Sequence, residues 1–149
     1  MRQIPLTQNQ FALVDDADFD WLNQFKWCAH WNPCTKSYYA MRGSKPKNGK
    51  RHVIRMHREI LGLKRGDKLE GDHRNHNTLD NQRENLRAVT CQQNHWNRKN
   101  SKGYSWDKRT KKYQARIKLN NKVISLGLFS TTKGAHNAYL QAKKQYHVI

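Results

Sequence analysis

The sequence predicts an α+β protein made of small modules. Short apolar runs alternate with turn-forming residues along most of its 149 residues, which is typical of small antiparallel sheets. Helical spacing of apolar residues replaces this alternation near residue 60 and again near the C-terminus. The charge is also uneven, with 13 Lys and Arg against 1 acid after residue 96. We therefore expect a β-rich region at 1–56, a central region at 57–98 and a C-terminal module at 99–149.

The first region is expected to fold as a small antiparallel sheet with one helix. Turns separate its strand-like runs, which are FALVD, KWCAHW, SYYAMR and HVIRMH. Between the first two runs, Asp16 or Asp18 is placed to cap a short helix that buries Trp21, Leu22 and Phe25.

The central region is expected to contain a helix, a hairpin or broad polar loop, and a second helix. The run MHREILGL has helical apolar spacing until Gly62 ends it. The run EGDHRNHNTLDN has too many Asn, Asp and Gly residues for a continuous helix. Thr90 is placed to cap the helix that follows, and this helix would turn Asn94 back toward the loop.

The C-terminal module is expected to be three strands and a helix. In KYQARIKL apolar and polar residues alternate strictly, so one face of the strand is apolar and the other is basic. The run VISLGLF alternates in the same way, with Ile124, Leu126 and Leu128 on its apolar side. Thr131 or Thr132 is placed to cap a helix whose apolar stripe covers that side. The stripe consists of Ala135, Ala138, Tyr139, Ala142 and Tyr146.

The net charge favours a polyanionic partner. Lys and Arg number 29 against 11 Asp and Glu, for a formal charge of +18, and nucleic acid is the commonest partner of so basic a protein. A membrane surface is a weaker alternative, because the sequence has no basic amphipathic helix with an aromatic-rich apolar face. Neither a secretory h-region nor a stretch of ~20 apolar residues is found. We therefore expect a cytoplasmic protein that binds nucleic acid.

The three cysteines suggest neither a disulfide framework nor a zinc ribbon, because their number is odd and no two form a CxxC pair. Cys28, His30 and Cys34 could supply three zinc ligands. The favoured interpretation is that these three residues pack within a Trp-rich segment.

Asp72 and His73 form the pair that most directly suggests chemistry. Phosphodiester hydrolysis needs a base to activate water and a cation to stabilise charge on the phosphate and the leaving oxygen. A neutral imidazole suits the base, and carboxylate or amide oxygens suit Mg²⁺. Adjacent side chains of a strand point to opposite sides, so a local kink is expected to bring both to one site. Asp-His pairs are also common in surface turns, and the residues alone leave both interpretations open.

The run MHREILGLKRGDKLEGDHRNHNTLDNQRENLRAVTCQQN resembles the HNH homing endonucleases of phages and bacteria, which belong to the ββα-metal class and are free-standing or intron-encoded. The similarity lies in the MHR helix, the DH pair, the Asn-rich loop, the NLRAVT segment and the Asn that follows, and the opening IPLTQNQFALVDDADFDWL is similar too. Two positions depart from the family: Gly71 replaces the usual aliphatic residue, and His76 replaces a common loop glycine. Histidine tolerates a left-handed backbone, so the loop is still expected to form.

This resemblance implies a ββα-metal HNH core and a role for each matching residue. His73 would be the general base and Asp72 a metal ligand. Asn85 would tie the loop together and orient the histidine, and Asn94 would be the second metal ligand. An oxygen ligand at this last position favours Mg²⁺ or Mn²⁺. His76 could be a second phosphate or metal contact, but a substituted turn residue is the favoured interpretation. Arg58 and Arg87 are either phosphate contacts or structural residues.

The segment GYSWDKRTKKYQARIKLNNKVISLGLFSTTKGAHNAYLQAKK resembles an AP2 domain, whose three-stranded sheet lies in the DNA major groove. Gly103, the YQARI and SLGLF strands and the AHNAY helix carry this similarity. In the major groove Arg reads guanine and Gln reads adenine. Trp106 fits either the core side or an exposed sheet edge. The expected DNA contacts are Arg98, Lys99, Lys102, Arg109, Gln114, Arg116 and Lys118.

These features together predict a site-specific, homing-type DNA endonuclease that hydrolyses phosphodiester bonds of double-stranded DNA with Mg²⁺ or Mn²⁺. One site per chain predicts a nick by a monomer, and a double-strand break would require a dimer or two successive cuts. Two alternatives stay open. The first is a non-catalytic, sequence-specific DNA-binding regulator on the same scaffold. The second is an RNA-binding module, which is disfavoured because the basic sheet face lacks aromatic residues for base stacking.

Overall fold

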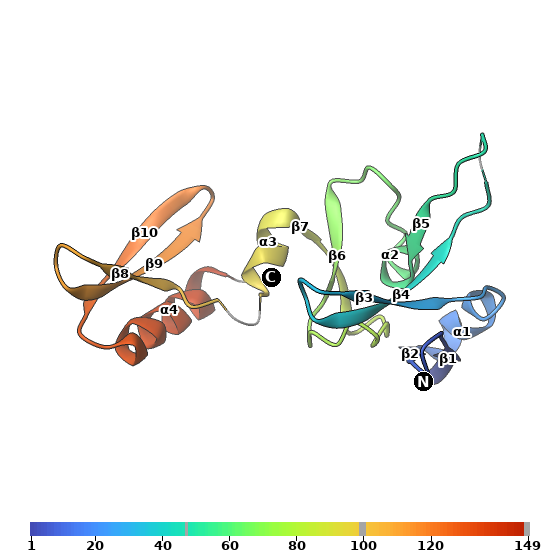
Figure 1. Cartoon of the computed structure of the whole chain (residues 1–149), viewed down its shortest axis with the longest axis horizontal. Coiled ribbons are helices and arrows are strands. Elements are labelled where there is room, and N and C mark those ends of the chain that lie inside the picture. Colours follow the sequence, from blue (N-terminus) through green and yellow to red (C-terminus); the bar gives the residue numbers. More distant parts are fainter. Residues whose placement is uncertain (47, 99–100, 148–149) are drawn as a thin grey trace. The chain divides into compact units, whose positions relative to one another are not determined.

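The computed structural model describes residues 1–46, 48–98 and 101–147, and within them it combines small antiparallel sheets with short helices and one long C-terminal helix (Figure 1). This architecture agrees with the expected α+β class. The chain forms two compact units, Met1–Asn94 and His95–Ile149. The expected boundary after residue 56 does not separate two units, because a single core contains residues from both sides of it. No helix in the described ranges is long and apolar enough to cross a membrane.

The described residues of the first unit form three small sheets, of which β1–β2 and β6–β7 have two strands and β3–β4–β5 has three. A short β1 strand pairs with β2 at the N-terminus, and the sequence pattern did not predict it. The elements are β1 (Arg2–Pro5), β2 (Phe11–Val14), α1 (Asp16–Leu22), β3 (Cys28–Asn32), β4 (Ser37–Gly43), β5 (Val53–Arg55), α2 (Met56–Ile60), β6 (Leu69–His73), β7 (Leu86–Thr90) and α3 (Cys91–Trp96), which crosses the unit boundary.

One core holds this unit together. It joins residues of the β1–β2 hairpin, α1 and β4 to Met56 and Ile60 of α2 and to Leu86 of β7. α1 contributes the fully buried Leu22, as expected, whereas Phe25 lies beyond the helix end and is exposed. Neither expected capping residue is the N-cap of α1, which is Asp15. The Asp15 carboxylate makes no cap hydrogen bond because it binds the segment at 82–83 instead.

The helix α3 begins with the cap that the sequence predicts. The Thr90 hydroxyl accepts a hydrogen bond from the Gln93 amide at 3.2 Å, and the Gln93 side chain accepts one from the Thr90 amide at 2.9 Å. This reciprocal pair satisfies two backbone amides at the start of the helix. It fixes the direction in which α3 leaves β7, and thereby the position of Asn94.

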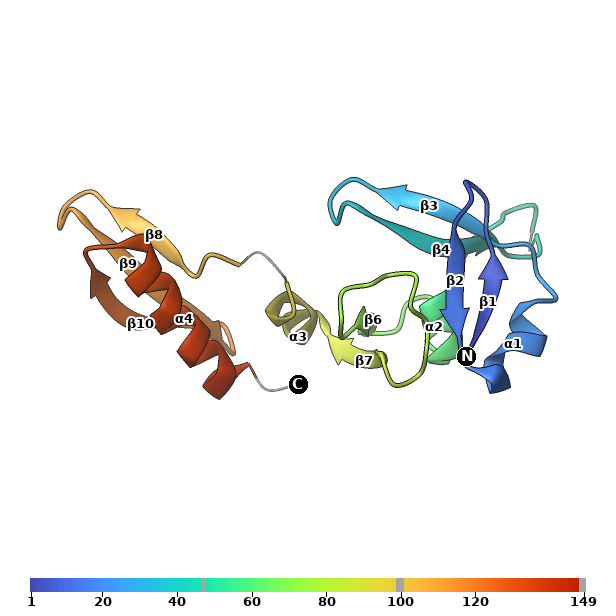
Figure 2. The same ribbon diagram turned by 90° about the horizontal axis from the view of Figure 1, so that it is seen from below.

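The second unit is a three-stranded sheet with one helix packed on it (Figure 2). Its elements are β8 (Tyr104–Asp107), β9 (Lys112–Leu119), β10 (Lys122–Phe129) and α4 (Thr132–Tyr146), with the strands in the order β10–β9–β8. Thr131 caps α4 by accepting a hydrogen bond from the Gly134 amide, as expected for one of the two candidate threonines. The helix buries Ala135, Tyr139 and Ala142 of the expected stripe.

The apolar alternation of β10 is interrupted. Its register against β9 shifts between Ser125 and Gly127, so that Leu126 forms a bulge and the following residues change face. Ile124 and Leu126 pack against the core as expected, but Leu128 is 44% exposed. The prediction for Leu128 was therefore wrong. A bulge adds one residue to the strand, so the residues after it face the side opposite to the one that the sequence alternation predicts.

Candidate active site

Strands β6 and β7 carry the residues that suggested chemistry. They pair antiparallel without a break in register from Leu69 opposite Thr90 to His73 opposite Leu86. The kink expected between Asp72 and His73 is therefore absent within the strand. Strand alternation places Glu70 and Asp72 on one face of β6 and Gly71 and His73 on the other.

Asn85 braces the connection between β6 and β7. Its side-chain oxygen accepts a hydrogen bond from the Asn75 amide at 3.0 Å, and its side-chain nitrogen donates to the Asp80 carbonyl at 2.7 Å. Asn75 and Asn77 form further turns with their own neighbours, which explains the high Asn content of the segment. His76 adopts a left-handed backbone with φ of 64°, so this histidine occupies the glycine-like position that the resemblance indicates.

Asn81, which the sequence pattern did not single out, accepts a hydrogen bond from His73. The Asn81 side-chain oxygen lies 3.3 Å from Nε2 of His73, and both residues are buried. The Asn81 backbone amide also donates to the Leu13 carbonyl at 2.8 Å, which anchors it to β2. The bracing of the loop expected of Asn85 is seen in the structure, and Asn81 contributes a hydrogen bond to the histidine.

His57 of α2 is a second buried histidine at this place. Its ring packs edge-to-face against the His73 ring, with ring centroids 4.9 Å apart and an interplanar angle of 69°. Tyr39 of β4 lies beyond the pair, with its ring centroid 6.3 Å from that of His73. The MHR run suggested a helix, but nothing in its pattern distinguished His57 from a surface residue.

Burial lowers the pKa of both histidines from the ordinary value of 6.5. For His73 the hydrogen bond to Asn81 and the negative charge of Asp72 offset part of this effect. For His57 burial is the largest cause, nearby positive charge adds to it, and the pKa lies well below 6.5. Both rings are therefore neutral at pH 7.

Asp72 lies on the opposite face of β6 and is ion-paired with Arg87. The Arg87 Nε and Nη2 atoms each lie 2.8 Å from Oδ2 of Asp72, and both side chains are largely buried. Arg58 donates to the backbone carbonyls of Leu69 and Lys64, at 3.1 and 2.6 Å. Both arginines thus have structural contacts within the unit.

Asn94 of α3 contacts Glu70 on the same face as Asp72. Its side-chain nitrogen donates to a Glu70 carboxylate oxygen at 2.5 Å. The face therefore presents two carboxylates and one amide, which is donor chemistry suited to a partly hydrated Mg²⁺ or Mn²⁺. Within the described ranges no group of three or more His, Cys, Asp or Glu is arranged to hold a metal ion. Glu70 was not predicted as a site residue. The signal that could have indicated it is strand alternation, because a residue two positions from Asp72 lies on the same face of β6.

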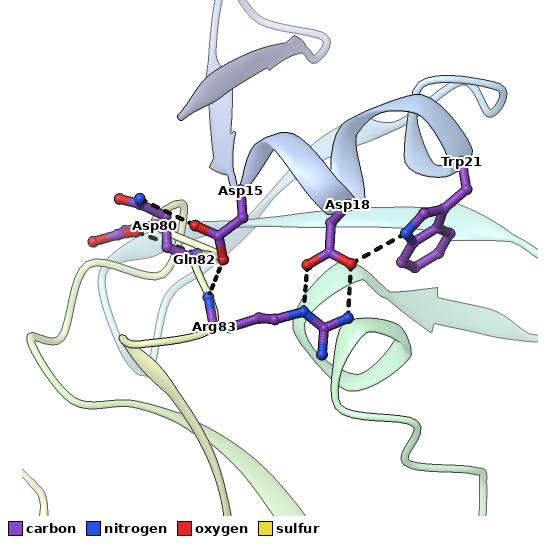
Figure 3. Close-up of polar contacts among 6 residues, drawn as sticks. All are labelled: Asp15, Asp18, Trp21, Asp80, Gln82 and Arg83. Carbon is purple, nitrogen blue, oxygen red and sulfur yellow. Dashed lines mark hydrogen bonds and ion pairs between the residues drawn. The ribbon is translucent and has the colours of Figure 1, made fainter.

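A polar clamp connects α1 to the segment that carries Asn81 (Figure 3). Arg83 donates from Nε and Nη2 to the two carboxylate oxygens of Asp18, both at 2.7 Å. Trp21 donates to the same carboxylate at 3.1 Å, and the Arg83 amide donates to Asp15 at 2.8 Å. Asp18, expected as a helix cap, is instead a buried partner of this clamp.

Cys28, His30 and Cys34 are all exposed, so the interpretation of these three as packing residues was wrong. They are not among groups arranged to hold a metal ion in the part of the chain that the structure describes.

The predicted DNA-binding residues that are described lie on exposed parts of the second unit. Ala115 and Ile117 are buried beneath α4, and Gln114, Arg116 and Lys118 alternate with them on the open face of β9. Arg116 donates to the Ser105 hydroxyl of β8 at 2.7 Å. Trp106 has its ring 4.8 Å from that of Tyr113 and is 50% exposed, at the edge strand. Arg98, Lys102 and Arg109 are exposed, and Lys99 lies outside the described residues.

Comparison with family models, with curated proteins and with solved structures finds no match to this chain.

Proposed function

We propose that this chain is a site-specific DNA endonuclease of the HNH type. In this proposal the open face of the β8–β10 sheet binds double-stranded DNA, and the β6–β7–α3 segment cuts one strand. The observation that carries the proposal is His73: a buried, neutral imidazole, hydrogen-bonded to Asn81 and adjacent in the chain to a carboxylate. A histidine in this state is suited to general-base catalysis.

The hydrogen bond to Asn81 decides which nitrogen of His73 acts. The Asn81 side-chain oxygen only accepts, so Nε2 of His73 carries the proton and the basic lone pair is on Nδ1. We infer that Nδ1 takes a proton from a water molecule as the water oxygen attacks phosphorus. The bond between phosphorus and the leaving oxygen then breaks, and the leaving oxygen takes a proton from solvent.

Asp72 and Asn94 are the residues we propose to hold a divalent cation, with Glu70 beside them. When bound, Mg²⁺ or Mn²⁺ would supply the positive charge that stabilises the phosphate and the leaving oxygen. Asp72 would have to exchange its ion pair with Arg87 for this role, at least in part. Arg87, once released, would be close to the same phosphate charge.

The second unit supplies the affinity in this proposal. Residues 97–149 contain 13 Lys and Arg against 1 acid, and neutralised phosphates release counterions. Gln114 and Arg116, on the open face of β9, are the candidates for base contacts, and the other predicted DNA contacts, among them Lys118, would bind phosphates. One site per chain would nick as a monomer. The enzyme would act in the cytoplasm of a bacterial or phage-infected cell.

A DNA-binding regulator without nuclease activity is the second candidate function. It is favoured by the ion pair between Asp72 and Arg87, which satisfies the carboxylate within the protein. It shares the basic sheet with the first candidate and differs only in whether bound DNA is cut.

A nicking assay on supercoiled plasmid separates the two. A plasmid library with randomised inserts is incubated with the protein and Mg²⁺, and the ends of nicked molecules are sequenced. We expect wild type to nick at a defined sequence, EDTA to stop it, and His73→Ala to bind the same DNA without cutting. His52→Ala, which changes an exposed histidine, is the matched control and should cut as wild type does. Equal cutting by His73→Ala and wild type, or binding by wild type without any cutting, would overturn the proposal.

A further inference from the structure

We propose that His57 is a positioning residue: its ring packs against the ring of His73 and fixes the orientation of that ring. The absence of a side chain at Gly71 leaves the space that the His57 ring occupies. This inference rests on the proposed nuclease function for its consequence in catalysis. Its physical content, that one ring fixes the orientation of the other, stands on contacts within the first unit.

His73 needs an external constraint to act as a base in one orientation. The χ2 torsion of histidine is broad, so the side chain does not fix its own ring plane. Asn81 provides one constraint, a hydrogen bond to Nε2 at 3.3 Å, which is longer than most hydrogen bonds made by nitrogen donors. A second constraint on the ring would keep Nε2 close to Asn81 and so define the direction of Nδ1.

The His57 ring supplies this second constraint. It is 4% exposed, packs edge-to-face on the His73 ring at 4.9 Å, and is carried by α2, which packs against β6. Aromatic rings prefer this arrangement to face-to-face stacking, and it resists rotation of either ring. Tyr39 contacts both histidines, with its ring centroid 5.9 Å from that of His57 and 6.3 Å from that of His73.

Gly71 is the residue in the sequence that this contact requires to be small. A Cβ atom built there would lie 2.5 Å from Cδ2 and 3.3 Å from Nε2 of His57, and 3.3 Å from a methyl carbon of Leu61. The backbone at Gly71 is an ordinary strand without a positive φ, so its conformation does not require glycine. The His57 ring therefore explains why glycine stands where the resemblance led us to expect an aliphatic residue.

The size of the catalytic effect follows from positioning. A misplacement of about 1 Å in a catalytic group costs on the order of 10²-fold in rate. We expect His57→Ala to lower the single-turnover nicking rate by about 10- to 100-fold, with DNA affinity within about twofold of wild type, because the DNA-binding residues lie in the other unit. A residue that merely supported folding would alter rate and stability together and leave the His73 ring as it is in the folded molecules.

The test uses the full chain and three variants, His57→Ala, Gly71→Ala and the double variant, with His52→Ala as control. Nicking rate, duplex affinity and long-range ¹H–¹⁵N NMR signals of the His73 ring are measured for each. Wild type should show one His73 tautomer, protonated at Nε2, and His57→Ala should show averaged signals. Gly71→Ala adds one methyl group against His57 and should lower the rate by itself, whereas in the His57→Ala background it should add no further loss.

An unchanged His73 tautomer in His57→Ala, or independent effects of Gly71→Ala in the two backgrounds, would overturn the inference. Should His57→Ala fail to fold, Gly71→Ala alone decides: an unchanged rate and unchanged His73 signals overturn it, and changes in both support it. Absence of nicking by wild type would instead refute the proposed function. In that case the NMR comparison still decides whether His57 fixes the His73 ring.

Discussion

Arg83 offers the sharpest test of how the first unit supports its candidate site. Its guanidinium binds both carboxylate oxygens of Asp18 at 2.7 Å, and Asp18 is 2% exposed. The substitution Arg83→Ala removes two charge-assisted hydrogen bonds and leaves the carboxylate with the Trp21 indole as its donor. The stability of the α1 contact should therefore depend strongly on Arg83.

The expected cost lies between two limits. Breaking a fully buried ion pair costs about 3–5 kcal/mol, and an exposed pair contributes about 0.2–1 kcal/mol. The Asp18 side chain is 2% exposed but that of Arg83 is 59% exposed, so water can reach the carboxylate once the guanidinium is gone. We expect Arg83→Ala to lower the unfolding free energy of the first unit by about 2 kcal/mol. For a unit of this size that corresponds to roughly 10 °C in melting temperature.

Urea unfolding, followed by NMR signals of the first unit, measures this cost without interference from the second unit. The matched control is Asp20→Ala, which removes an exposed pair with Arg2 at 3.3 Å and should cost less than about 0.5 kcal/mol. Equal costs for the two variants would refute the reasoning from burial. Faster amide exchange at residues 81–85 in Arg83→Ala would show that the clamp also steadies the segment carrying Asn81.

Three further outcomes are expected. Gly103→Ala places a Cβ 1.9 Å from the Tyr139 ring at a φ of 71°, so the second unit should lose about 2–4 kcal/mol in thermal unfolding, and a loss under 1 kcal/mol would contradict this. The two buried histidines have pKa values below their unfolded 6.5, so the unfolded chain binds more protons. The first unit should be fully stable above pH 6.5 and lose up to ~1.4 kcal/mol per pH unit per histidine below it, which a pH series of urea midpoints would reveal. Duplex affinity should fall steeply with salt, and Lys118→Ala on the open face of β9 should lower the slope by about one, whereas Lys144→Ala on the exposed side of α4 should leave it unchanged.

Local features of the fold were predictable because their causes are local. The caps at Thr90 and Thr131 depend on residues three positions away, and the alternation in β9 separates Ala115 and Ile117 from Arg116 along one strand. The register shift in β10 had no such signature, because a bulge depends on how the partner strand pairs.

Contacts between distant segments could not be predicted from these patterns. The Asp18–Arg83 pair spans 65 positions, and His57 and His73 belong to different elements. Asn81 looked like any other residue in a run rich in Asn and Asp. Gly71 was the one visible signal of the histidine pair, as a glycine in a strand that no turn requires.

The unbroken register of β6 separates the two groups that the proposed reaction needs. Asp72 forms an ion pair with Arg87, whereas the ring of His73 packs against the ring of His57. The charge of Asp72 raises the pKa of His73, against the larger effect of burial. Asp72→Asn should therefore lower the pKa of His73 further, while its hydrogen bond to Asn81 and its contact with His57, and hence its tautomer, stay as in wild type. An NMR titration of the His73 ring tests both statements, with Asp20→Asn as control. A rise in the His73 pKa, or a change of tautomer, would show that the two side chains depend on each other through geometry and not only through charge.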